Sequence, residues 1–321
     1  MTPRAALVSG TGFALAAGLM WGLVFVVPLL LPHYPAALLS FGRYLAFGLI
    51  ALPLAWIDRA RIAELTRADW REAARLALVG NLLYYLFLAA AIQRAGGPLP
   101  TMIIGTLPVV IAVASNLRDA RRDGRLAWGR LAPSLVLIAA GIALVNRAEM
   151  RSLAPDADLG RYAVGAALAL GAVVCWTWYP LRNADWLRHH PGRSPSTWAT
   201  AQGIATLPLA ALGYAGLWAL GGGGVAMPFG PDALHFIALM FVIGLFASWL
   251  GTLCWNEASQ RLPTTLAAQL IVFETLAALS YAFVLRGRWP GADTGLGIAL
   301  LVAGVMWALR SRPLPIAAHG A

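Results

Sequence analysis

Residues 262–285 read LPTTLAAQLIVFETLAALSYAFVL, and the only formally charged side chain in this stretch is that of Glu274. A helix needs about 20 apolar residues to cross a hydrocarbon layer ~30 Å thick. Backbone N–H and C=O groups in lipid must pair with one another, which a helix achieves within a single segment. The stretch therefore predicts a membrane-spanning helix.

Similar apolar blocks recur along the chain and predict nine more spans. The ten predicted spans are 9–30, 36–57, 74–93, 98–117, 128–146, 161–181, 197–220, 234–256, 262–285 and 292–310. The composition agrees, because 60% of the residues are hydrophobic and 12% are charged, against about 45–50% and about 25% in soluble domains. The sequence thus predicts an all-α integral membrane protein with ten transmembrane helices.

The arginines indicate membrane topology and argue against a nucleic-acid partner. The net charge is +10, but all 24 basic residues are arginines, most of them in short loops between apolar blocks. With a cytoplasmic N-terminus, 16 arginines fall on the cytoplasmic side and six on the other. Because cytoplasmic loops are enriched in Arg and Lys, the sequence predicts that both termini are cytoplasmic in a bacterial inner membrane.

An internal repeat becomes visible when the chain is shifted by 163 residues. Leu99-Pro100-Thr101 then falls on Leu262-Pro263-Thr264, and Gln93 falls on Asn256. Two five-helix repeats, residues 1–150 and 151–321, are therefore expected. Five is odd, so the second repeat must insert with the opposite orientation, as in transporters built from inverted repeats with a substrate site near the bilayer midplane.

Several short motifs resemble those of the drug/metabolite transporter superfamily, EamA type. They are Trp21-Gly22, Phe41-Gly42-Arg43-Tyr44, Leu107-Pro108-Val109, Trp176, Trp255-Asn256-Glu257-Ala258 and Phe273-Glu274-Thr275. The resemblance covers residues 10–310. It implies a ten-helix carrier of two inverted repeats, with cytoplasmic termini, that moves small metabolites such as amino acids.

Two residues depart from the pattern of that family. Thr275 replaces the usual proline after Glu274, and Arg288 stands where a second glutamate often follows Gly287. These departures bear on the gating contacts and leave the expected fold unchanged.

Glu274 and Arg43 are the predicted polar residues of the transport site. A charge near the bilayer centre costs about 3 kcal/mol on insertion scales, so Glu274 must face protein or water. It is interpreted as a proton-coupling carboxylate or as a counter-charge for a substrate amine, the structural alternative being a buried helix contact. Arg43 has three interpretations: holding a substrate carboxylate, pairing with Glu274, or reaching the interface as a topological residue.

A set of polar and aromatic residues is predicted to line the substrate cavity with them. Helical spacing puts Asn81, Tyr84 and Tyr85 on one face, and Trp249, Thr252 and Asn256 on another. The full set of candidates is Trp21, Arg43, Asn81, Tyr84, Tyr85, Trp176, Trp249, Thr252, Asn256, Gln269, Glu274 and Tyr281. For the tryptophans, an interfacial belt is the alternative interpretation.

The sequence thus predicts a secondary transporter, with export favoured, of small amphipathic metabolites. Protons are the candidate coupling ion, and a monomer or a homodimer is expected. The alternatives are an intramembrane enzyme and a non-transporting membrane subunit. No H-E-x-x-H or G-x-S-x-G motif is present, and Cys175 and Cys254 lack metal-ligand or disulfide spacing. No catalytic residue, metal or cofactor is therefore predicted.

Overall fold

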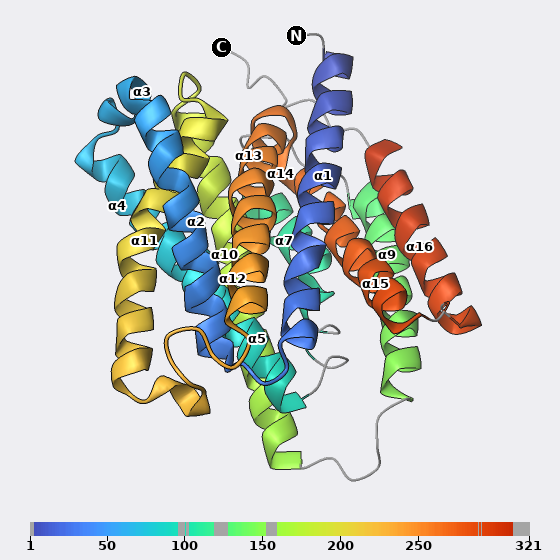
Figure 1. Cartoon of the computed structure of the whole chain (residues 1–321). Helices are drawn as coiled ribbons and strands as arrows, with labels where there is room; N and C mark the ends of the chain where they lie inside the picture. The colour runs from blue at the N-terminus through green and yellow to red at the C-terminus, as the bar shows by residue number, and fades with distance from the viewer. Residues whose placement is uncertain are drawn as a thin grey trace.

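The computed structural model describes residues 3–95, 100, 103–118, 128–151, 159–287, 289 and 291–310, and this part of the chain is helical without strands. The first half contains α1 (Pro3–Leu30), α2 (Ala36–Ile57), α3 (Arg59–Ala63), α4 (Arg67–Leu76), η1 (Ala77–Leu83), α5 (Tyr84–Ala95), α7 (Leu107–Arg118) and α9 (Trp128–Met150). The second half contains α10 (Leu159–His189), α11 (Pro195–Ala219), η2 (Gly222–Gly224), α12 (Ala233–Ile243), η3 (Gly244–Leu250), α13 (Gly251–Arg261), α14 (Thr264–Leu270), α15 (Val272–Arg286) and α16 (Ala292–Arg310). The helices form one bundle (Figure 1).

Each of the ten predicted spans contains at least part of a described helix. Six helical stretches are long and apolar enough to cross a membrane: 4–30, 36–57, 67–95, 160–189, 233–261 and 266–285. Shorter apolar helices cover 107–118, 128–144 and 292–307, and α11 has 25 residues. The prediction of a helical membrane protein is therefore confirmed.

Some predicted boundaries were wrong because polar turns extend the helices beyond their apolar blocks. The third predicted span begins at residue 74, whereas α4 begins at Arg67, where Thr66 and Asp69 form a capping box. Likewise α10 continues to His189, eight residues beyond the predicted end.

Two helical stretches contain a π-helical segment near their middle. In 67–95 this segment is η1, and in 233–261 it is η3. Both stretches are 29 residues long. A glycine in or beside each segment lets a ring approach: a Cβ on Gly80 would lie 2.1 Å from the Tyr179 ring, and one on Gly251 would lie 2.7 Å from the Trp21 indole nitrogen. π-Helical segments often occur at functional sites.

The ninth predicted span is not one continuous helix. It is divided at Ile271 into α14 and α15, and the Glu274 amide donates to the Ile271 carbonyl at 2.9 Å just after the division. A comparable turn at Gly105 and Thr106 precedes α7. Pro108 follows it in the first turn of α7, where a proline is tolerated. Residues 99 and 101 of the expected repeat motif lie outside the described part.

The two halves pack against each other in matched pairs. α2 packs on α11, α9 on α16, α7 on α14, α5 on α10 and α13 on α1. Figure 1 shows α1 descending from the upper end while α10 ascends, and likewise α4–α5 descending while α12–α13 ascends. The upper end carries α3, the start of α4 and the C-terminal ends of α10 and α13; it is called the arginine-rich end below.

Candidate functional site

A small, largely enclosed cavity lies where α1, α2, α10 and α15 meet the two π-helical segments. Its volume is about 10 Å³, which is room for about one water molecule. The residues that line it are Trp21, Val24, Arg43, Tyr44, Asn81, Tyr84, Trp176, Ala247, Ser248, Thr252 and Glu274. Both halves of the chain contribute to it.

Arg43 is held on one side of this cavity by η3. Its side chain is buried, and Nε donates to Ser248 Oγ at 3.0 Å while Nη2 donates to the Ala247 carbonyl at 3.1 Å. The guanidinium carbon lies 4.9 and 4.8 Å from the ring centroids of Tyr44 and Tyr85, in range for cation–π attraction. Among the described residues nothing accepts a hydrogen bond from Nη1. This nitrogen of the Arg43 guanidinium group can therefore donate to another group.

Glu274 brings the opposite charge to the same cavity. It lies in the first turn of α15, buried like Arg43. Within the described chain its Oε2 atom has no hydrogen-bond partner, and no ion pair joins it to Arg43. A charge held in a protein interior without a partner is strongly unfavourable. The carboxyl group therefore needs a proton, a water molecule or a cationic ligand.

Aromatic rings form the rest of the wall. The Trp176 ring stacks on Tyr84 at a centroid distance of 4.6 Å and on Tyr179 at 5.0 Å, and it meets Trp21 edge-on at 5.1 Å. The Tyr84 hydroxyl and the Trp176 indole nitrogen are also buried without a partner in the described structure. Buried polar groups are almost always hydrogen-bonded, so these two atoms, with Arg43 Nη1 and Glu274 Oε2, indicate a site for a ligand.

Seven of the twelve candidates from the sequence lie on the cavity wall, namely Trp21, Arg43, Asn81, Tyr84, Trp176, Thr252 and Glu274. Tyr85 lies beside the cavity against Arg43. The other four are placed elsewhere by their hydrogen bonds: Trp249 donates to Thr200, Asn256 accepts from Asn183, Gln269 accepts from Ser134, and Tyr281 donates to the Leu19 carbonyl.

The π-helical segment explains why Trp249 does not share the cavity face with Thr252. Trp249 lies within η3, whereas Thr252 and Asn256 follow it in α13. Because hydrogen bonds in a π-helix run from i to i+5, the segment changes the register on which the predicted face depends. A spacing of 3.6 residues therefore misplaces Trp249 relative to Thr252.

Two groups of residues were missed by the sequence reasoning. Tyr44 and Ser248 line the cavity and contact Arg43; the position of Tyr44 next to Arg43 was the available signal.

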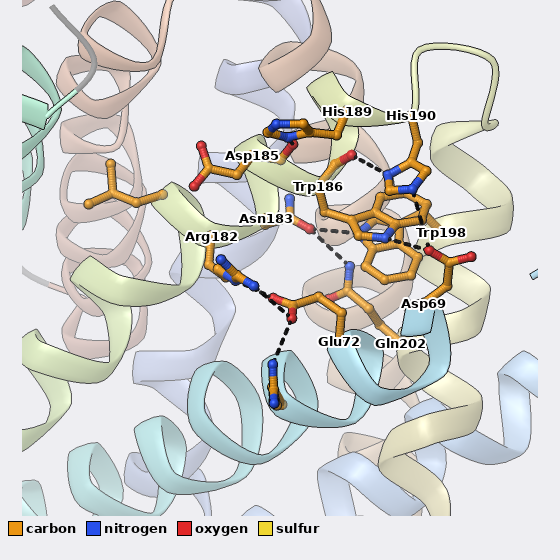
Figure 2. A network of polar contacts seen from close by, with 12 residues as sticks. Asp69, Glu72, Arg182, Asn183, Asp185, Trp186, His189, His190, Trp198 and Gln202 are labelled. Carbon is orange, nitrogen blue, oxygen red and sulfur yellow. Dashed lines mark hydrogen bonds and ion pairs between the residues drawn. The ribbon is translucent and has the colours of Figure 1, made fainter. Parts of the chain in front are cut away.

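The second group is a buried polar network toward the arginine-rich end (Figure 2). Asn183 Oδ1 accepts from Trp198 Nε1 at 2.9 Å and from Gln202 Nε2 at 3.1 Å.

Comparisons with known proteins agree with this architecture. The model of the EamA-like transporter family matches residues 8–147. Inner membrane protein YtfF of Escherichia coli (strain K12) is 56% identical over 310 residues, covering 96% of this chain and 97% of that protein. A solved structure, described only as the crystal structure of a protein, shares the fold with a TM-score of 0.70 and 19% identity, over 94% of this chain and 97% of its own. The chain is thus a multi-pass helical inner-membrane protein that belongs to the EamA-like transporter family, a family of transporters and not of enzymes.

Proposed function

We propose that this chain is a secondary transporter, with export favoured, of small amphipathic metabolites such as amino acids. The observation that carries the proposal is the convergence of four unpaired polar atoms, from Arg43, Tyr84, Trp176 and Glu274, on one aromatic-walled cavity. A zwitterion would satisfy them, with its carboxylate on the Arg43 donor and its ammonium on Glu274. The rings would cover its apolar part.

The transport cycle is proposed to be alternating access between two inverted five-helix repeats, residues 1–150 and 151–321. Opposite directions of α1 and α10, and of the two stretches with π-helical segments, support this arrangement. So does the packing, because exchanging the repeats converts the contact of α1 with α13 into that of α10 with α5. Two repeats of five membrane-spanning helices each give ten spans in total. Such repeats rock about a central site.

The closed cavity fits one stage of such a cycle. With room for about one water molecule, the site in its present form excludes an amino acid. Helices of the two repeats have to separate before a substrate enters. We place the end that carries α3 and the start of α4, with both termini, in the cytoplasm, because the helix ends described there contain Arg59, Arg61, Arg67, Arg71, Arg188 and Arg261.

Protons are proposed as the coupling ion. Glu274 is the one carboxylate on the cavity wall among the described residues, and a carboxylate that is protonated on one side and ionised on the other can link flux to a pH gradient. If Glu274 acts only as a counter-charge for the amine, its replacement abolishes binding as well as coupling. Substrate binding measured beside gradient-driven flux separates the two roles.

A toxicity screen followed by flux measurements tests the proposal. An overexpressed exporter should confer resistance to a subset of amino acids or their analogues. The selected compound is then followed in proteoliposomes, where Arg43→Gln and Glu274→Gln are expected to lose nearly all flux. Asp293→Asn removes an exposed carboxylate remote from the cavity and should transport like the wild type. Equal flux in all four proteins would overturn the proposal.

A further inference from the structure

A second, open pocket lies at the arginine-rich end, between α4 and the C-terminal turns of α10. It has a volume of about 490 Å³, close to fifty times that of the central cavity. Its walls carry both signs of charge, and its lining includes Asp69, Glu72, Arg71, Arg182, Asp185 and His190. A pocket of this size and polarity can hold a small zwitterion in contact with water.

Side chains from the two repeats close the floor of this pocket (Figure 2). Arg182 of α10 donates two hydrogen bonds to the Glu72 carboxylate of α4, from Nε at 2.6 Å and from Nη2 at 3.1 Å. One turn further along α10, Trp186 Nε1 donates to Asp69 Oδ1 at 3.0 Å. Both carboxylates are buried, whereas the Arg182 side chain is about half exposed; these charge-assisted hydrogen bonds are the main link between α4 and α10.

The Trp186 ring also stacks on two neighbouring rings below the pocket. It stacks on Trp198 of α11 with a centroid distance of 3.4 Å and an interplanar angle of 7°, and His190 stacks on it at 4.5 Å. Trp198 is fully buried, whereas His190 lines the open pocket. The pair of indoles therefore separates the pocket from the interior of the bundle.

Buried hydrogen bonds, followed by one ring stack, connect this indole pair with the central cavity. Trp198 and Gln202 both donate to Asn183, and the Tyr179 hydroxyl donates to Gln202 Oε1 at 2.9 Å. The Tyr179 ring then stacks on Trp176, which lines the cavity. Buried amide groups can replace a hydrogen bond to each other by one to water at little cost in free energy. An apolar interface would form no such hydrogen bonds when water enters.

We propose that the pocket between α4 and α10 is the mouth of the transport path at the arginine-rich end. The Glu72–Arg182 and Asp69–Trp186 contacts are a latch that keeps this mouth closed, and the polar seam through Asn183 is the route to the cavity. A zwitterionic substrate pauses in the pocket before the latch opens. This inference rests on the proposed transport function.

Access of a reporter cysteine from one face tests the latch. Thr252→Cys is placed on the cavity wall in a background with Cys175→Ala and Cys254→Ala, and oriented vesicles expose the arginine-rich face to an impermeant methanethiosulfonate. We expect Glu72→Gln and Arg182→Gln to raise the modification rate on the order of tenfold, a usual size for such a coupling. Combining Glu72→Gln with Arg182→Gln should raise the rate no further than either substitution alone.

Arg61→Gln is the matched control, because it removes an arginine at the same end whose partner, Asp58, lies only three residues away. It should leave the rate unchanged. An unchanged rate in Glu72→Gln and in Arg182→Gln, with the reporter still reactive from the opposite face, would overturn the latch and leave the transport function standing. A reporter that reacts from neither face in any variant would overturn both.

Discussion

The two ends of this bundle are closed by different chemistry. At the arginine-rich end, ion pairs of Arg182 with Glu72, Arg118 with Asp185 and Arg193 with Glu64 join the first half to the second.

At the opposite end, the Tyr34 hydroxyl donates to the Phe229 carbonyl at 3.0 Å and accepts from the Asp232 amide at 2.9 Å, and the Tyr34 ring stacks on Phe236 at 5.1 Å. One end is thus held mainly by ion pairs and the other mainly by a ring and backbone groups, with the exposed Arg151–Asp293 pair beside them, so the two openings should respond to different conditions.

The largest effect is expected from Tyr34→Ala. Removal of a buried aromatic ring costs about 3–5 kcal/mol, and here it also takes away both hydrogen bonds of the hydroxyl. Modification of Thr252→Cys from the face opposite the arginine-rich end should rise sharply, without a change from the other face. Tyr34→Phe keeps the stacking and should respond less. Equal responses of Tyr34→Ala and Tyr34→Phe would show that the ring does not close this end.

Glu72→Gln should have the next largest effect, and at the arginine-rich end alone. Hydrogen bonds to a charged group contribute about 1.5–3 kcal/mol, and Gln keeps the shape of the side chain. The melting temperature in detergent should fall less than in Tyr34→Ala, and it should fall little further when Arg182→Gln is added. A fall equal to that of Tyr34→Ala would contradict the distinction between the two ends.

Salt should act mainly on the arginine-rich end, which has more ion pairs between the two halves. Ion pairs near the surface weaken as the Debye length falls from about 10 Å at 0.1 M to about 3 Å at 1 M. Between these concentrations, modification of Thr252→Cys should accelerate from the arginine-rich face severalfold. From the opposite face it should change little. Equal acceleration at both faces would indicate a general loosening of the bundle.

The smallest effect is expected from Arg151→Gln. Arg151 pairs with Asp293 at 3.0 Å and links α9 to α16, but the two side chains are 60% and 53% exposed. Exposed ion pairs contribute about 0–1 kcal/mol, so melting temperature and reporter access should stay within experimental error. A change as large as that of Glu72→Gln would mean that exposure does not decide the strength of these contacts.

Much of the fold was predictable because lipid restricts it. Apolar blocks long enough to span a bilayer must be helices, whereas the two repeats indicated by the shift of 163 residues stay a prediction. The π-helical segments η1 and η3 were not predictable, because a hydropathy pattern does not distinguish them from α-helix. The division at Ile271 was equally hidden, since the apolar run continues through it.

The candidate site was predictable where a single residue is costly in lipid. Glu274 and Arg43 stood out because a charged side chain inside an apolar span is costly in lipid and must face protein or water. Both line the cavity. The latch was missed because Arg182 reads as a topology signal and Glu72 as a polar residue just outside its predicted span. Their pairing across 110 residues of chain depends on how α4 and α10 pack, which no local pattern records.

The most direct test of the account is the reactivity of Thr252→Cys from each face, measured with and without the transported substrate. Alternating access of one cavity to the two sides predicts reaction from both faces, and bound substrate should slow both reactions. Absence of reaction from either face, or reaction unaffected by a saturating substrate, would contradict it.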